Sequence, residues 1–97
     1  MSDITDNTTK GRFEVTREGH TAELVYDVED GRLVLIHTEV PEELGGRGIA
    51  GELVRAALER AAREGLTIVP FCPYARRWLE RHRDQLGGVV IDWDAKP

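Results

Sequence analysis

The sequence has one cysteine and no long apolar run, and each shortage excludes a class of protein. One cysteine excludes an internal disulfide and a zinc site built from several cysteines. No apolar stretch approaches the ~18 residues that a membrane-spanning helix needs. The opening residues Met1–Asp6 lack the cationic and apolar regions of a secretory signal. We therefore expect a cytoplasmic protein with no membrane contact.

Basic residues are also in short supply. Lys and Arg number 13 against 18 Asp and Glu, which gives a net charge of −5. Because a nucleic-acid binder needs a basic face to neutralise phosphates, this balance argues against a nucleic-acid partner. The chain has 97 residues, 40% hydrophobic and 32% charged, which suits one small globular domain. We predict a flexible tail over residues 1–11 and a single domain over residues 12–97.

Apolar residues alternate with polar ones in the first half of that domain, which is typical of half-buried strands. The alternation predicts an antiparallel meander of three strands over residues 13–17, 22–28 and 33–40. A helical apolar period then begins, and its stripe consists of Ile49, Leu53, Val54, Ala57, Leu58, Ala61 and Ala62.

A nearly continuous apolar strand over residues 67–71 follows the helix, and a second helix begins at Pro73. A strand-helix-strand crossover makes this last strand parallel to the third one. Residues 89–93 are open to two interpretations, an edge strand or a packed tail. The predicted fold class is α/β, with a mainly antiparallel sheet and one parallel junction.

A glycine-rich turn precedes the first helix, in the run Gly45-Gly46-Arg47-Gly48-Ile49-Ala50. The first turn of a helix has free backbone N–H groups and the positive end of the helix dipole. Glycines let an anion approach those donors, and an arginine fork suits a pyrophosphate. The alternative is an ordinary turn whose glycines relieve strain, since neither a GxGxxG nor a GK[ST] motif is present.

The same run resembles the acetyl-coenzyme A pyrophosphate motif of the Gcn5-related N-acetyltransferases, Q/R-x-x-G-x-G/A. Gly48 matches the glycine of that motif and Ala50 its last small residue, whereas Gly45 stands where the motif has Arg or Gln. The short YjdJ-type subgroup is more similar still, through His37-Thr38-Glu39-Val40 and Pro70-Phe71-Cys72-Pro73-Tyr74. The resemblance covers about residues 13–83.

The resemblance implies a small fold of this family, in which the third and fourth strands splay apart and the pantetheine arm of the cofactor enters the gap. It implies acetyl-coenzyme A or coenzyme A as cofactor. The residues it assigns to cofactor binding are Val40, Gly45, Gly46, Arg47, Gly48, Ile49, Ala50, Cys72 and Tyr74.

The activity that the resemblance implies is transfer of an acetyl group to an unknown amine, such as that of a protein or peptide. The sequence has no counterpart of the N-terminal helix pair that forms part of the acceptor site in longer acetyltransferases. The acceptor would therefore meet an open surface, or a second copy or another partner would complete the site. The alternatives are a non-catalytic module that binds coenzyme A or an acyl-coenzyme A, and a small protein-interaction domain.

Three residues are candidates for the chemistry. Glu39 and His37 lie two apart on one strand and share a face, so either could take a proton from the acceptor amine. Cys72, just before Pro73, is predicted to cap the second helix, where the helix dipole favours a nucleophilic thiolate. The alternatives are a solvated Glu39, a structural His37 and a buried, inert Cys72. No third ligand is in view, so we expect no metal site.

The second helix also carries a local basic cluster. It has two interpretations, a solvated helix face or a dock for the adenosine 3′-phosphate of coenzyme A or for an acidic partner. The cluster consists of Arg76, Arg77, Arg81 and Arg83.

Overall fold

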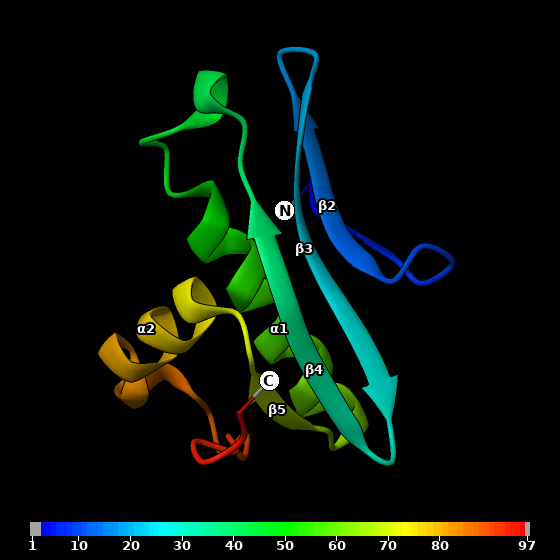
Figure 1. Ribbon diagram of the computed structural model, residues 1–97, viewed down its shortest axis with the longest axis vertical. Helices are drawn as coiled ribbons and strands as arrows, with labels where there is room; N and C mark the ends of the chain where they lie inside the picture. Colours follow the sequence, from blue (N-terminus) through cyan, green and yellow to red (C-terminus); the bar gives the residue numbers. More distant parts are fainter. Residues whose placement is uncertain (1–2, 97) are drawn as a thin grey trace.

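The computed structural model describes residues 3–96 and shows an α/β fold with a five-stranded sheet (Figure 1). In chain order the elements are β1 (Thr5–Asn7), β2 (Arg12–Arg17), β3 (His20–Glu29), β4 (Arg32–Glu39), η1 (Glu42–Leu44), α1 (Ile49–Glu64), β5 (Thr67–Pro70), α2 (Pro73–Arg81) and η2 (Arg83–Gln85).

The strands lie side by side in chain order, β1-β2-β3-β4-β5. The first three pairings are antiparallel and the β4–β5 pairing is parallel. The sequence predicts all of these except the β1–β2 pairing. In Figure 1, α1 lies behind the sheet and α2 lies to one side of it. The predicted α/β class, with one parallel strand-helix-strand junction, is confirmed.

The predicted apolar stripe of α1 forms the centre of the core. Its buried residues pack with those of the sheet and of α2 into a single cluster. Only Ala62 departs from the prediction, because it is exposed. At the end of the helix Gly65 adopts a left-handed φ of 68°, which closes the helix as expected.

The N-terminal segment differs from the prediction. Instead of a flexible tail over residues 1–11, residues 5–7 form β1, which pairs with β2. Two polar side chains of the domain hold this strand: the Tyr26 hydroxyl donates a hydrogen bond to Asp6, and the Arg60 guanidinium donates another at 3.1 Å. Residues 1–2 lie outside the described residues. The prediction is wrong for β1 because polarity alone does not reveal partners that are distant in sequence.

The C-terminal segment packs as a tail with one bridge to the sheet. Ile91 forms an isolated parallel bridge with Ile68, through hydrogen bonds of 2.9 and 2.8 Å that join Ile68 to Val90 and Asp92. Of the two interpretations of residues 89–93, a packed tail therefore describes this segment better than a full edge strand.

Strands β4 and β5 part half-way along β4. Their pairing ends at Leu35 and Pro70, and β4 then runs on to Glu39 while the chain after β5 turns into α2 (Figure 1). The register of β3 and β4 shifts by one residue at the same level, which leaves Ile36 as the extra residue of a β-bulge. This parting is the predicted splay of the central strands.

Candidate functional site

The turn before α1 has the backbone that an anion site requires. Gly46 and Gly48 have φ of 77° and 72°, a left-handed conformation that other residues seldom adopt. A Cβ at either glycine would meet nothing within 4 Å, so the approach to the helix is open. Gly48 is the N-cap and provides no side-chain hydrogen bond, so the first N–H groups of α1 are left for another acceptor.

A groove of about 230 Å³ lies at this helix start. Seven residues predicted to bind cofactor line it: Val40, Gly45, Gly46, Gly48, Ile49, Ala50 and Tyr74. Two predicted residues, Arg47 and Cys72, are not in its lining, and Leu44 is an addition that the sequence reasoning missed. A lone apolar residue in the run Glu42-Glu43-Leu44-Gly45 is the signal that could have found Leu44, which is fully buried.

Arg47 turns away from the groove. Its guanidinium forms an ion pair with Glu18 in the β2–β3 hairpin, and both side chains are exposed. Because an exposed ion pair is weak, an incoming phosphate could compete with Glu18 for this arginine.

Cys72 begins α2, as predicted, at the point where β5 parts from β4. Its thiol is 4% exposed and lies 3.1 Å from the Thr38 hydroxyl of β4. Its backbone N–H donates to the Leu35 carbonyl at 2.9 Å. The cysteine therefore joins the two sides of the strand gap, and Thr38 is a site residue that the sequence reasoning missed.

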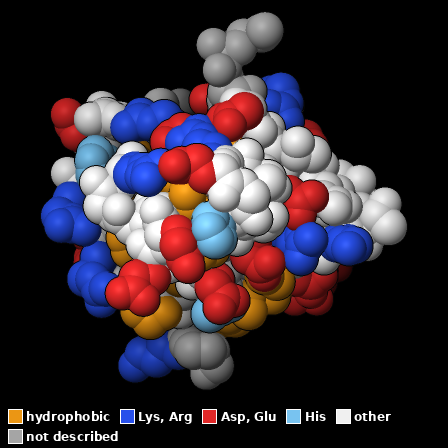
Figure 2. All heavy atoms as spheres, turned by 90° about the horizontal axis from the view of Figure 1, so that it is seen from above, with side chains coloured by type: hydrophobic (Ala, Val, Ile, Leu, Met, Phe, Trp, Pro, Cys, Tyr) orange, Lys and Arg blue, Asp and Glu red, His pale blue; other side chains and the backbone are white. Residues whose placement is uncertain are grey.

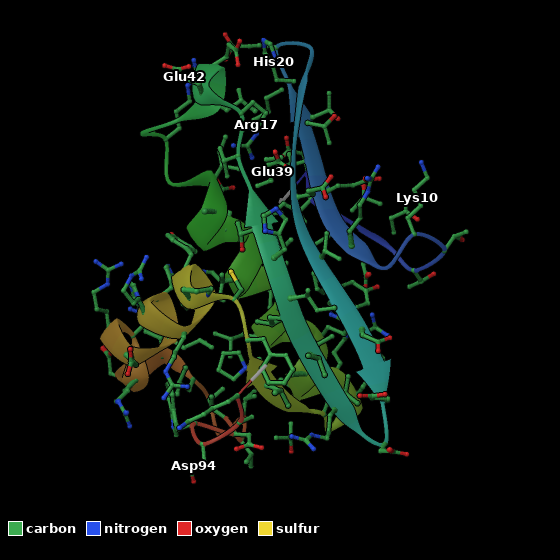
Figure 3. All side chains as sticks on the ribbon, in the orientation of Figure 1. Lys10, Arg17, His20, Glu39, Glu42 and Asp94 are labelled. Carbon is green, nitrogen blue, oxygen red and sulfur yellow. The ribbon has the colours of Figure 1, made fainter. Side chains whose placement is uncertain are left out.

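His37 and Glu39 lie on the other side of β4 from Cys72. Successive strand residues face opposite ways, and Thr38 between them turns toward Cys72. His37 Nε2 and Glu39 Oε2 are 3.7 Å apart, with side chains 60% and 69% exposed. Figure 3 shows Glu39 beside the end of β4. The structure thus pairs the predicted His37 and Glu39 and separates them from Cys72 by the thickness of the sheet.

Glu39 belongs to a row of carboxylates on the open face of the sheet. It lies directly opposite Glu23 on β3, which in turn lies opposite Glu14 on β2. Arg12 forms ion pairs with Glu14 at 2.5 Å and with Glu23 at 3.2 Å. The hydrogen bond from Asn7, followed by that from Arg12, holds the pKa of Glu14 below its ordinary value. Glu39 has no arginine beside it, only His37, among the described residues.

Acidic side chains gather near the middle of the end of the molecule that carries η1 and the β2–β3 hairpin, with Lys and Arg side chains around them. Figure 2 looks onto this end and shows acidic side chains gathered around a histidine.

Neither a metal site nor a membrane span is evident in the described part of the chain. No group of three or more His, Cys, Asp or Glu side chains within residues 3–96 is arranged to hold a metal ion. Neither helix in that range has the length and apolar character needed to cross a bilayer.

A helix that opens with free N–H groups, a glycine-lined groove and parted central strands together define a class of acyl-transfer domain. The family model described as GCN5-related N-acetyl-transferase matches residues 12–87. The chain belongs to this acetyltransferase family, which confirms the resemblance found in its sequence.

The chain is also similar to curated proteins. The chicken (Gallus gallus) and human (Homo sapiens) proteins called Protein NATD1 are each 39% identical to the chain over 62 residues. The match covers 63% of this chain, 56% of the chicken protein and 55% of the human one. The chain therefore spans little more than half the length of these relatives.

Proposed function

We propose that the chain transfers the acetyl group of acetyl-coenzyme A to an amine on a protein or peptide. One observation carries this proposal: the glycine-lined groove at the start of α1 opens where β4 and β5 part. The groove offers donors for a diphosphate, and the gap between the strands offers a way toward the residues at the end of β4.

The groove fits coenzyme A in its chemistry. The unpaired N–H groups at the start of α1, with Gly46 and Gly48 beside them, suit the pyrophosphate. Val40, Leu44 and Tyr74 supply an apolar wall of the kind that suits a pantetheine arm. When bound, acetyl-coenzyme A supplies the acetyl group as a reactive thioester.

Glu39 is the proposed proton acceptor. An amine with the ~10.4 pKa of a lysine is protonated at neutral pH and must lose a proton before it can attack. A carboxylate can take that proton directly or through one water, and Glu39 stands at the end of β4 with no arginine beside it in the described chain. His37, at 3.7 Å, would help to hold the Glu39 side chain in place.

In this scheme Cys72 is not a nucleophile: through its contacts with Thr38 and the Leu35 carbonyl it holds the start of α2 against β4. Its burial and its contact with Thr38 limit access of an acceptor to the sulfur. Direct attack of the amine on the thioester therefore suits the geometry better than a route through an acetylated cysteine.

The open face of the sheet favours a large acceptor over a small amine. Glu39 and His37 are exposed, so a small amine would find few walls around it. A protein or peptide acceptor would cover the exposed site with its own surface. A second copy of the chain or another partner could also supply the missing walls. The single domain over residues 12–97 and the cytoplasmic location stay predictions.

The test is calorimetric titration of coenzyme A into wild type and two glycine variants. Gly48→Glu places a carboxylate at the start of α1, where it competes with the phosphates. Gly65→Glu is the matched control, because Gly65 has nearly the same φ, 68° against 72°, and equally open surroundings at the far end of the helix. Both variants carry the same strain and the same change of charge.

We expect wild type and Gly65→Glu to bind coenzyme A and Gly48→Glu to lose binding. Equal affinity of both variants would refute the groove as the cofactor site. Transfer of a radiolabelled acetyl group to a lysine-containing peptide then separates the enzyme from a module that only binds coenzyme A. Binding without transfer to any acceptor would favour that second function.

A further inference from the structure

The arginines of α2 and η2 are not equivalent in the structure. The Arg76 and Arg83 guanidinium carbons lie 5.8 and 4.4 Å from the ring centroid of Trp93, and Arg76 also reaches Glu80 at 4.0 Å. Arg77 and Arg81 are exposed and have neither an ion pair nor an aromatic ring among residues 3–96. The only other arginine of that range without a partner is Arg63, on α1.

Helical geometry places Arg77 and Arg81 on a different flank of α2 from Arg76, and Arg83 follows in η2. Tyr74, Arg77 and Arg81 are spaced by three and four residues, so they share one side of the helix. The buried residues Ala75, Trp78 and Leu79 form the face toward the core, which separates this side from the one near Trp93. The basic cluster seen in the sequence therefore divides into two pairs. Arg76 and Arg83 lie over Trp93, whereas Arg77 and Arg81 have no ion pair or aromatic ring beside them among residues 3–96.

Arg77 and Arg81 lie beyond the groove along α2. Tyr74 lines the groove at the start of α1. With a helical rise of about 1.5 Å per residue, Arg77 lies roughly 4.5 Å beyond Tyr74 along the α2 axis and Arg81 roughly 10 Å beyond it. Both positions are within reach of a ligand that is held at the groove and extends along α2.

We propose that Arg77 and Arg81 bind the 3′-phosphate of coenzyme A and so select it over nucleotides that lack this phosphate. The assignment rests on the proposed function. In coenzyme A the 3′-phosphate and the pyrophosphate are carried by the same ribose, so a pyrophosphate at the start of α1 leaves the 3′-phosphate only one ribose ring away. An arginine presents a fork of donors that matches phosphate oxygens. On a chain with a net charge of −5, two adjacent unpaired arginines are the local groups suited to that dianion.

The test compares coenzyme A with 3′-dephospho-coenzyme A, which differs only by the phosphate in question. Calorimetry gives both dissociation constants for wild type, for the double variant Arg77→Ala/Arg81→Ala and for Arg83→Ala. The last variant is the matched control, since it removes the neighbouring arginine that stacks on Trp93. Circular dichroism checks that each variant is folded.

Wild type should bind coenzyme A about tenfold more tightly than its 3′-dephospho form, or about 1.4 kcal/mol. The double variant should lose most of this preference while its affinity for 3′-dephospho-coenzyme A stays unchanged, and Arg83→Ala should keep the preference. Added salt should reduce the ratio of the two dissociation constants in wild type, because Arg77 and Arg81 are both exposed and their attraction for phosphate is screened.

Equal binding of the two nucleotides to wild type would overturn the assignment and leave the proposed function standing. A loss of preference in Arg83→Ala as large as in the double variant would also overturn it. If neither nucleotide binds wild type, the proposed function fails and the assignment fails with it.

Discussion

Gly51, in the first turn of α1, lies against the indole ring of Trp78 on α2, and replacing it with alanine should destabilise the protein. A Cβ at this position would come within 2.7 Å of Trp78 Nε1 and 3.4 Å of Cδ1. In most helix interiors the same change is favourable by about 1 kcal/mol, because glycine is a poor helix former. The sign of the effect therefore tests whether α1 and α2 are in the close contact described above.

The ring has little room to yield. Trp78 is 6% exposed, and the His82 ring stacks on it at a centroid distance of 4.0 Å. The Arg55 guanidinium carbon lies 5.1 Å from the ring centroid. Overpacking of a filled site costs about 1–3 kcal/mol, so after the gain in helix propensity we expect a net loss of about 1 kcal/mol. In a chain of this length such a loss lowers Tm by about 4–8 °C.

The measurement is thermal and urea denaturation of Gly51→Ala followed by circular dichroism. Ala62→Gly is the reference variant: Ala62 is exposed on the same helix, so its loss of stability calibrates helix propensity alone. In a Trp78→Phe background, which removes the indole nitrogen, Gly51→Ala should become neutral or stabilising. A higher Tm for Gly51→Ala in the wild-type background would show that the helices are not in this contact.

Three further predictions concern the site and the sheet. Glu39→Gln should lower the rate of acetyl transfer by about a hundredfold and Cys72→Ser by far less, measured as initial rates with one acceptor; the reverse order would favour a cysteine nucleophile. Burial, followed by the hydrogen bond to Asp6, raises the pKa of Tyr26 from 10.0 to about 12, so the folded state favours the neutral phenol. Stability should therefore be full below pH 10 and fall as the pH rises toward 12, a loss that Tyr26→Phe should abolish in urea titrations at several pH values. Gly45→Arg should bind coenzyme A about fivefold more tightly in calorimetry, because it restores a charged donor, and weaker binding would count against that contact.

Most of the fold follows from local patterns in the sequence. The alternation in β2 and β3 and the stripe of α1 predict their own burial, and the crossover rule predicts the parallel β4–β5 pair. Local patterns do not predict β1, because Thr5–Asn7 is short and polar and is held by side chains of β3 and α1. Gly51 is similar, since only the position of Trp78 explains a glycine at this point in the first turn of the helix.

The candidate site divides in the same way. The open helix end was predictable, because a glycine-rich turn precedes the helix. Which of its three glycines adopt a left-handed φ, Gly46 and Gly48, was not predicted. The contact of Cys72 with Thr38 was not predictable either, because it depends on where β5 parts from β4.

The splay itself is the step that links fold to site. Leu35 and Pro70 are the last paired residues of β4 and β5, and three features follow at once beyond them: the bulge at Ile36, the cap of α2 at Cys72 and the exposed end of β4 at Glu39. Pro70 ends β5, and Pro73 then fixes the first turn of α2. β4 and β5 thus part midway along β4, and both Glu39 and the groove lined by Val40 lie beyond the point where they part.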